Sequence, residues 1–163
     1  MPAPIEFANG SEWTIGEPDL VLRSRDMTRP AIGPDRWGDI GLVPTGLTED
    51  RYVKAVEVRE INDIPPGVGD NTVGGRYIFH HMTYSSGVLS EDGTDIIDDT
   101  RVRWPIHEVG RNADIFPEKF GTLLQANSAL HLGASHLHSN GIAETTAHLE
   151  FGFIFHPKDY APE

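Results

Sequence analysis

The sequence predicts an all-β fold of the antiparallel β-sandwich kind. Three observations support this class. Seventeen glycines and twelve prolines are spread along the 163 residues, and both residue types interrupt regular elements. No stretch keeps an apolar i, i+3, i+4 pattern long enough for a helix. Short segments with strand composition recur between turn signals instead.

The predicted strands follow an irregular start. Residues 1–18 are expected to be an irregular segment, because the first forty residues are rich in Pro, Gly and Asp. The polar segment 85–117 is too long for an empty loop, so we expect a hairpin or an ordered functional excursion there. The predicted strands are residues 19–24, 39–46, 51–61, 75–84, 119–126, 129–138 and 147–155.

Length and charge restrict the domain organisation and the partners. A chain of 163 residues fits a single domain, here 1–163, that buries roughly 70% of its unfolded surface. Its 25 acidic and 13 basic side chains give a formal net charge of -12. Such a field repels phosphate backbones and anionic lipids, so we expect cations rather than nucleic acid or membrane as partners.

Cysteine content and the first residues carry further expectations. With no cysteine, the chain has no disulfide, thiolate metal site or thiol nucleophile. The opening MPAPIEFANG has neither a basic region nor an apolar run, and no later window approaches the ~20 apolar residues of a membrane span. We therefore expect a soluble chain without an export signal.

Five of the eight histidines lie in two predicted strand regions, 77–84 and 131–141. Regular alternation places His136 and His138 on one face with Leu130 and Leu132, opposite His131. Two imidazoles at i and i+2 on one strand are compatible with binding one ion.

His80 and His81 are adjacent, and neighbours on a regular strand point to opposite faces. Both histidines can bind one ion only if the backbone twists, bulges or ends near them. Residues 85–87 are a possible end of this strand. Otherwise one is buried and hydrogen-bonded while the other is exposed. A site of imidazoles without thiolates or carboxylates favours copper or zinc. The candidate metal ligands are His80, His81, His136 and His138.

Other motifs indicate structure rather than chemistry. The chain lacks G-x-S-x-G, Walker, G-x-G-x-x-G and H-E-x-x-H signatures. The Gly-rich segment 65–75 precedes a strand, so it is interpreted as a long turn rather than a phosphate cradle. We expect packing or structural roles for Trp13, Trp37, Trp104, His107, His148 and His156.

The order of four segments resembles the first domain of the copper type II, ascorbate-dependent monooxygenases, the family of peptidylglycine alpha-hydroxylating monooxygenase. These segments are PTGLTEDRYVKAVEVRE, FHHM, FPEKFGTLLQANSALHLGASHLHSNG and HLEFGFIF, within residues 12–157. The resemblance implies a jelly-roll sandwich and a copper held by three imidazoles, two of them adjacent. Carried over, these are His80, His81 and His136, while His138 replaces His136, adds a ligand or lines the approach.

The chain departs from this family in two respects. Family members use a second domain, whose His-x-His and Met hold another copper, but only six residues follow Pro157 here. The family's cysteines are absent. The resemblance therefore implies a redox partner protein or a second domain in another chain. It also implies a periplasmic or secreted location, although no signal peptide is seen.

Three functional hypotheses remain open. The first is a mononuclear copper domain for electron transfer, copper handling or partner-dependent monooxygenation. The second is a cupin-like metal-dependent enzyme, with His136, His138 and Glu144 as ligands. The third is a β-sandwich binding module without metal. If a metal is bound, we expect Asp98, Asp99, Glu144 or backbone carbonyls to orient its ligands.

Overall fold

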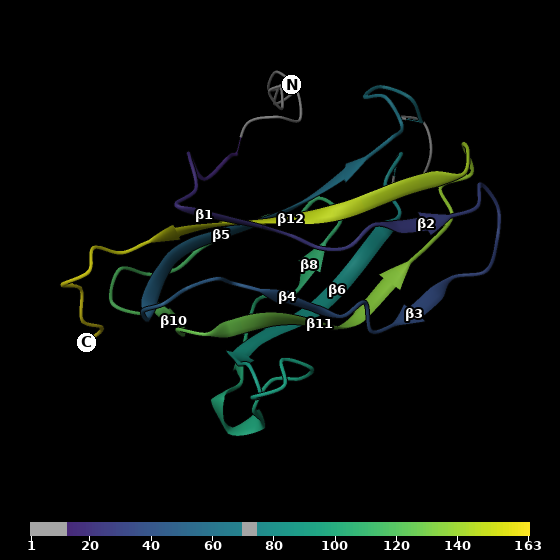
Figure 1. Cartoon of the computed structure of the whole chain (residues 1–163). Helices are drawn as coiled ribbons and strands as arrows, with labels where there is room; N and C mark the ends of the chain where they lie inside the picture. Colours follow the sequence, from purple (N-terminus) through teal and green to yellow (C-terminus); the bar gives the residue numbers. More distant parts are fainter. Residues whose placement is uncertain (1–12, 70–74) are drawn as a thin grey trace, which may run out of the picture.

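Two antiparallel sheets pack face to face in the computed structural model, which describes residues 13–69 and 75–163 (Figure 1). The predicted all-β sandwich is confirmed, while its jelly-roll type stays a prediction. Of the predicted irregular segment 1–18, residues 1–12 lie outside the described residues, and 13–18 form no strand. Part of the predicted long turn, residues 70–74, also lies outside them.

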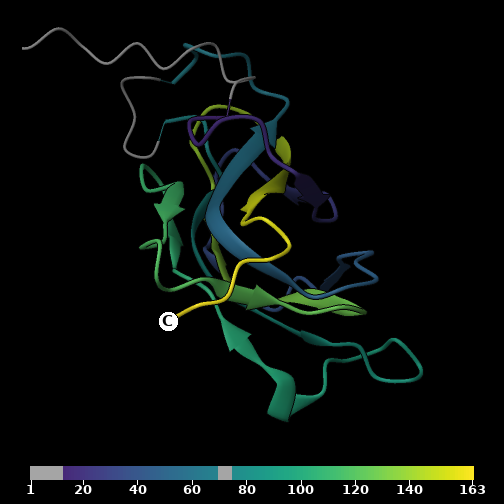
Figure 2. The ribbon, with the colours of Figure 1, turned by 90° about the vertical axis from the view of Figure 1, so that its left-hand side faces the viewer.

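Sheet A is built on the pairing of its two longest strands, β5 and β12. Figure 2 shows the curvature of β5, drawn in blue. The main path of the sheet runs β1-β12-β5-β10, with β2 also pairing with β12 and β9 with β5. Its strands are β1 Leu20–Arg23, β2 Met27–Arg29, β5 Arg51–Asn62, β9 Ala113–Ile115, β10 Thr122–Leu124 and β12 Thr145–Phe155.

Sheet B is built on the pairing of β6 with β11. Its main path runs β3-β11-β6-β7, with β4 also pairing with β11 and β8 with β6. Its strands are β3 Arg36–Gly38, β4 Leu42–Pro44, β6 Phe79–Val88, β7 Val102–Arg103, β8 His107–Glu108 and β11 Ser128–Leu137.

The core lies between the sheets and follows the alternation of β12. Leu149, Phe151, Phe153 and Phe155 are all buried, as their period-2 spacing predicts. Sheet B contributes side chains from its inner face, including Met82, which is fully buried. Residues one step away from these, such as His81 and Thr83, therefore point to the outer face of sheet B.

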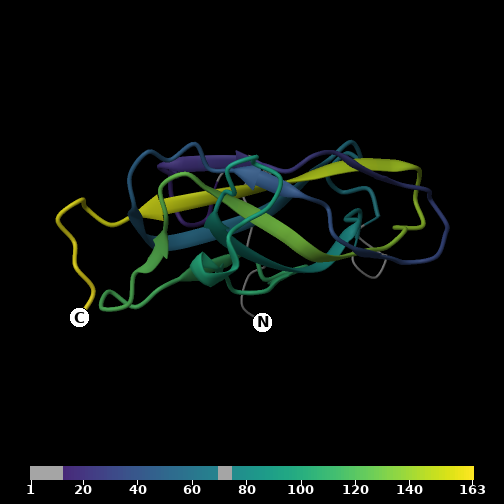
Figure 3. The ribbon, with the colours of Figure 1, turned by 60° about the horizontal axis from the view of Figure 1, so that its bottom comes forward.

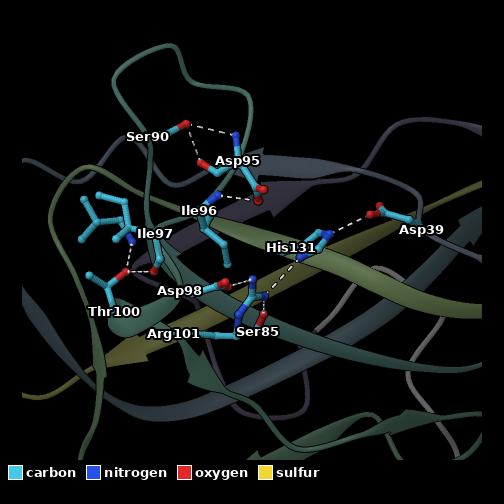
Figure 4. Close-up of polar contacts among 11 residues, drawn as sticks. Asp39, Ser85, Ser90, Asp95, Ile96, Ile97, Asp98, Thr100, Arg101 and His131 are labelled. Carbon is cyan, nitrogen blue, oxygen red and sulfur yellow. Dashed lines mark hydrogen bonds and ion pairs between the residues drawn. The ribbon is translucent and has the colours of Figure 1, made fainter.

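The long polar segment after β6 is ordered, as expected. It contains the 3-10 helix η1, Asp98–Thr100, followed by β7, β8 and β9. Part of the segment lies below the sandwich in the view of Figure 2. Arg101 anchors it to the outer face of sheet B by donating to Ser85 Oγ and to His131 Nδ1 (Figure 4). Strand β6 continues to Val88, so the predicted strand end at 85–87 is wrong.

The remaining described segments lie at the periphery. The chain after β12 extends past one end of the sandwich (Figure 3). Within 13–69 and 75–163, no helix has the length and apolar character to cross a bilayer.

Candidate metal centre

A bulge in β6 brings the adjacent histidines to one side. His136 pairs with His81, but the next residue of β11, Leu137, pairs with Phe79, so His80 is an extra residue in β6. Two residues of β6 thus oppose one residue of β11, which is how a β-bulge re-aims side chains. The bulge that joint binding by His80 and His81 requires is therefore present.

A second irregularity reverses the faces of β11. His131 pairs with Ser85 and Ala134 with Thr83, so three steps on β11 match two on β6. Leu132 is buried before this point, and Leu137 is buried after it. His136 therefore lies on the outer face with His131. The prediction that His136 shares a face with Leu130 and Leu132 is wrong, because it assumed a regular strand.

The Nδ1 atoms of three histidines converge on the outer face of sheet B. Nδ1 of His81 lies 2.9 Å from Nδ1 of His80 and 3.4 Å from Nδ1 of His136. One ligand atom from each of the three falls within 4.8 Å of the others. Two imidazole nitrogens about 2.0 Å from one tetrahedral ion would be about 3.3 Å apart. The donor set therefore fits a single metal ion.

Asp35 determines which nitrogen of His136 faces this cluster. His136 Nε2 lies 2.7 Å from the Asp35 carboxylate, to which its N–H donates a hydrogen bond, so Nδ1 keeps a lone pair. The same hydrogen bond holds the pKa of Asp35 below its ordinary value. Sequence reasoning missed Asp35, which lies 101 residues away in the chain. Of its candidates, Asp98 pairs with Arg101 instead.

Trp37 covers the site from β3. It pairs across the sheet with His136, and the two rings stack with centroids 3.9 Å apart and an interplanar angle of 7°. Its ring also lies edge-on to His81, with centroids 5.0 Å apart. Trp37 packs against the site, as expected of a packing residue, yet 62% of it is exposed. Trp104, by contrast, is buried.

The electrostatic surroundings favour neutral imidazole. Desolvation lowers the pKa of His80, and the nearby positive charge of His136 and His138 when protonated lowers it further. A neutral imidazole is the form that ligates metal. At neutral pH, His80 can therefore offer the lone pair of a ring nitrogen to a metal without first releasing a proton.

Glu60 holds the start of β6 in place. Its buried carboxylate accepts hydrogen bonds from the backbone N–H groups of Ile78 and Phe79, at 3.0 and 2.8 Å. These two donors immediately precede His80. Burial raises the pKa of Glu60 despite these bonds. The carboxylate thus fixes the chain where it enters the bulge.

His138 lies beside the group of three. Its Nε2 is 2.8 Å from the carbonyl oxygen of Tyr77, and its ring centroid is 5.4 Å from that of His80. In the described part of the chain, the ligand atoms that converge belong to His80, His81 and His136. His138 as a metal ligand stays a prediction. The cupin-like set with Glu144 is not brought together there either.

The other histidines of the described ranges are engaged elsewhere. His131 Nε2 donates to Asp39 over 2.7 Å, while its Nδ1 faces Arg101 (Figure 4). His148 lies near Asp26 and Arg23, and His156 stacks on Tyr160. His107 is buried, and burial lowers its pKa to about 4. These positions agree with the structural roles expected for His107, His148 and His156.

Comparison with known proteins adds no relative to this picture. No protein-family model, curated protein or solved structure matches the chain.

Proposed function

We propose that the protein binds one copper ion through Nδ1 of His80, His81 and His136 and uses it for one-electron transfer. The convergence of these three atoms at the bulge carries the proposal. The set contains imidazoles alone, and imidazole suits copper, with zinc as the alternative metal.

The remaining residues would prepare the site rather than supply electrons. Asp35 orients His136, and Glu60 fixes the chain before His80. Copper held by three neutral imidazoles would supply one-electron chemistry, because such ligands suit both of its common oxidation states. Since the rings are already close together, little rearrangement of the protein would accompany a change of charge at the site.

The resemblance to copper type II monooxygenases supports this choice of metal. The three histidines that the resemblance carries over are the three whose ligand atoms converge. We propose that the chain corresponds to the electron-storing first domain of that family. Oxygen chemistry would then need a second copper site in addition to this one.

Titration of tag-free apo protein with copper and zinc, followed by calorimetry, tests the metal. We expect one copper ion per chain and nitrogen hyperfine structure in the electron paramagnetic resonance spectrum of the Cu(II) form. His81→Ala and His136→Ala should each lose this tight binding. His148→Ala is the matched control, because His148 lies on sheet A away from the cluster, and it should bind as the wild type does.

Two results would contradict the proposal. Weak binding that is indifferent to His81→Ala and His136→Ala would mean that the histidines only hydrogen-bond to one another. A clear preference for zinc under competition, with no stable Cu(I) form, would exclude the electron-transfer role. Metal binding by the three histidines would still stand in that case.

A further inference from the structure

Trp37 links the candidate metal centre to the protein surface. One face of its indole stacks on the ring of His136, and 62% of the residue is exposed. Exposed tryptophans are unusual outside interaction sites, because the ring combines a large apolar area with few rotamers. Here the exposed ring is in contact with a candidate metal ligand.

The surroundings of Trp37 are acidic and partly apolar. Trp37, His136, His81 and Glu108 form one cross-strand row on the outer face of sheet B. At the two ends of the row, Glu108 is exposed and the Asp35 side chain is 54% exposed. Ile106, just before β8, is 44% exposed.

The basic residue nearest in sequence points away from this row. Arg36 pairs with Leu137, whose side chain is buried in the core, so Arg36 lies on the other face of sheet B. Arg111 lies next to Glu108 through an isolated bridge, and its guanidinium pairs with Asp114. The row therefore keeps the exposed carboxylates of Glu108 and Asp35, on a protein whose formal net charge is -12. Such a surface attracts cations and raises their rate of encounter.

We propose that Trp37 is the contact surface for a positively charged one-electron donor, which here takes the place of the anionic ascorbate used by the family that the chain resembles. The electron reaches the metal from this donor. This inference rests on the proposed copper function. The donor is oxidised by one electron and Cu(II) is reduced to Cu(I), so no bond breaks and no proton moves. A donor on the exposed part of Trp37 would contact a ring that itself stacks on His136, the proposed metal ligand.

The docking part can be tested without copper by nuclear magnetic resonance. Tris(ethylenediamine)chromium(III) and hexacyanochromate(III) are paramagnetic probes of opposite charge that exchange no electrons with apo protein. At low salt the cationic probe should broaden the indole N–H signal of Trp37 selectively, and the anionic probe should not. Trp104 is the internal control, because it is buried and its Nε1 donates to Ser86.

Salt gives a second readout of the same contact. Since the Debye length falls from about 30 Å at 0.01 M to about 3 Å at 1 M, the broadening at Trp37 should be lost at high salt. Equal broadening of Trp37 by both probes, or none by the cationic probe, would overturn the proposal whatever the metal does.

The electron-transfer part uses copper-loaded protein and hexaammineruthenium(II) as donor. Reduction of Cu(II) should slow about tenfold or more between low and high salt. It should also slow in Trp37→Leu, which removes the stacked ring, and recover in Trp37→Phe, which restores an aromatic ring. Calorimetry and the Cu(II) resonance spectrum of both variants are measured first, so that altered metal binding is recognised.

The outcomes separate the two proposals. If the wild type does not bind copper, the proposed function is wrong, while the probe experiment still reports on docking at Trp37. Unchanged reduction rates in Trp37→Leu with intact copper binding would defeat the role of Trp37 alone.

Discussion

His80 stands outside the regular pairing of β6 with β11, and its Nδ1 lies 2.9 Å from Nδ1 of His81. Adjacent residues of a regular strand cannot make this contact, because their side chains leave opposite faces of the sheet. The bulge is thus the feature that allows both residues of a His-His dipeptide to offer a ligand atom to one metal ion.

Deleting His80 should weaken the metal site and leave the fold. Without the extra residue, β6 and β11 can pair in regular register between His136 and Leu137, so Phe79 stays opposite Leu137 in the core. We expect cooperative thermal unfolding and copper binding no tighter than that of His80→Ala, because both variants keep only His81 and His136 of the three ligands. Tight binding by the deletion variant would contradict the role given to the bulge.

Removing the acceptor at Asp35 should weaken metal binding. Residues that orient a ligating histidine typically change metal affinity by about 10–100-fold, and Asp35→Ala is expected within that range. Asp35→Asn keeps an oxygen acceptor and should lose less. Asp39→Asn is the control, because Asp39 accepts from His131 rather than from His136. Competition titration with a copper chelator measures all three, and equal affinities would rule out the orienting role.

Glu60 should matter for stability through its hydrogen bonds. Removing a buried acceptor costs about 1–3 kcal/mol per unsatisfied group, so Glu60→Ala should lower the free energy of unfolding, because the N–H groups of Ile78 and Phe79 lose their partner. Glu60→Gln keeps one oxygen and should lose less. Chemical denaturation of the variants checks this order.

The pH dependence of the Glu60 effect has a defined sign. The pKa of Glu60 is raised in the folded protein. The contribution of Glu60 to the free energy of unfolding is therefore present at low pH and is lost as the pH rises through the folded-state pKa. The free energy of unfolding of the wild type should therefore fall relative to Glu60→Gln as the pH rises above the ordinary glutamate range. A constant difference across this range would contradict it.

His107 should make the protein sensitive to acid. Burial lowers its pKa to about 4, so the unfolded chain binds a proton more readily than the folded protein. Neutral His107 therefore contributes up to about 3 kcal/mol to the free energy of unfolding. This contribution is present above the unfolded-state pKa of about 6.5 and is lost as the pH falls towards about 4. His107→Leu cannot titrate and should show a flatter stability curve there. An identical curve would contradict the assignment.

The sequence predicts the fold class and most of the site for different reasons. Strands such as β12 alternate regularly, so period-2 analysis identifies their core face correctly. Irregular strands defeat the same analysis, because one extra residue exchanges the two faces. The sequence pattern therefore identifies His136 as a candidate ligand but predicts the wrong face of β11 for its side chain.

The neighbours of the site were out of reach for sequence reasoning. Asp35 and Trp37 meet His136 through pairing of β3 with β11, across about a hundred residues of chain. No local pattern marks an aspartate or a tryptophan in a Pro- and Gly-rich segment as part of a metal site. Asp35 and Trp37 are distinguished only by their position next to β11, and that position depends on the tertiary structure.

The measurement that tests the central claim most directly is the 15N spectrum of the histidine rings with diamagnetic Cu(I) bound. We predict that the Nδ1 signals of His80, His81 and His136 shift together to values typical of metal-bound nitrogen, while Nε2 of His136 remains protonated and hydrogen-bonded to Asp35. Binding through Nε2, or shifts confined to other histidines, would contradict the site at the bulge.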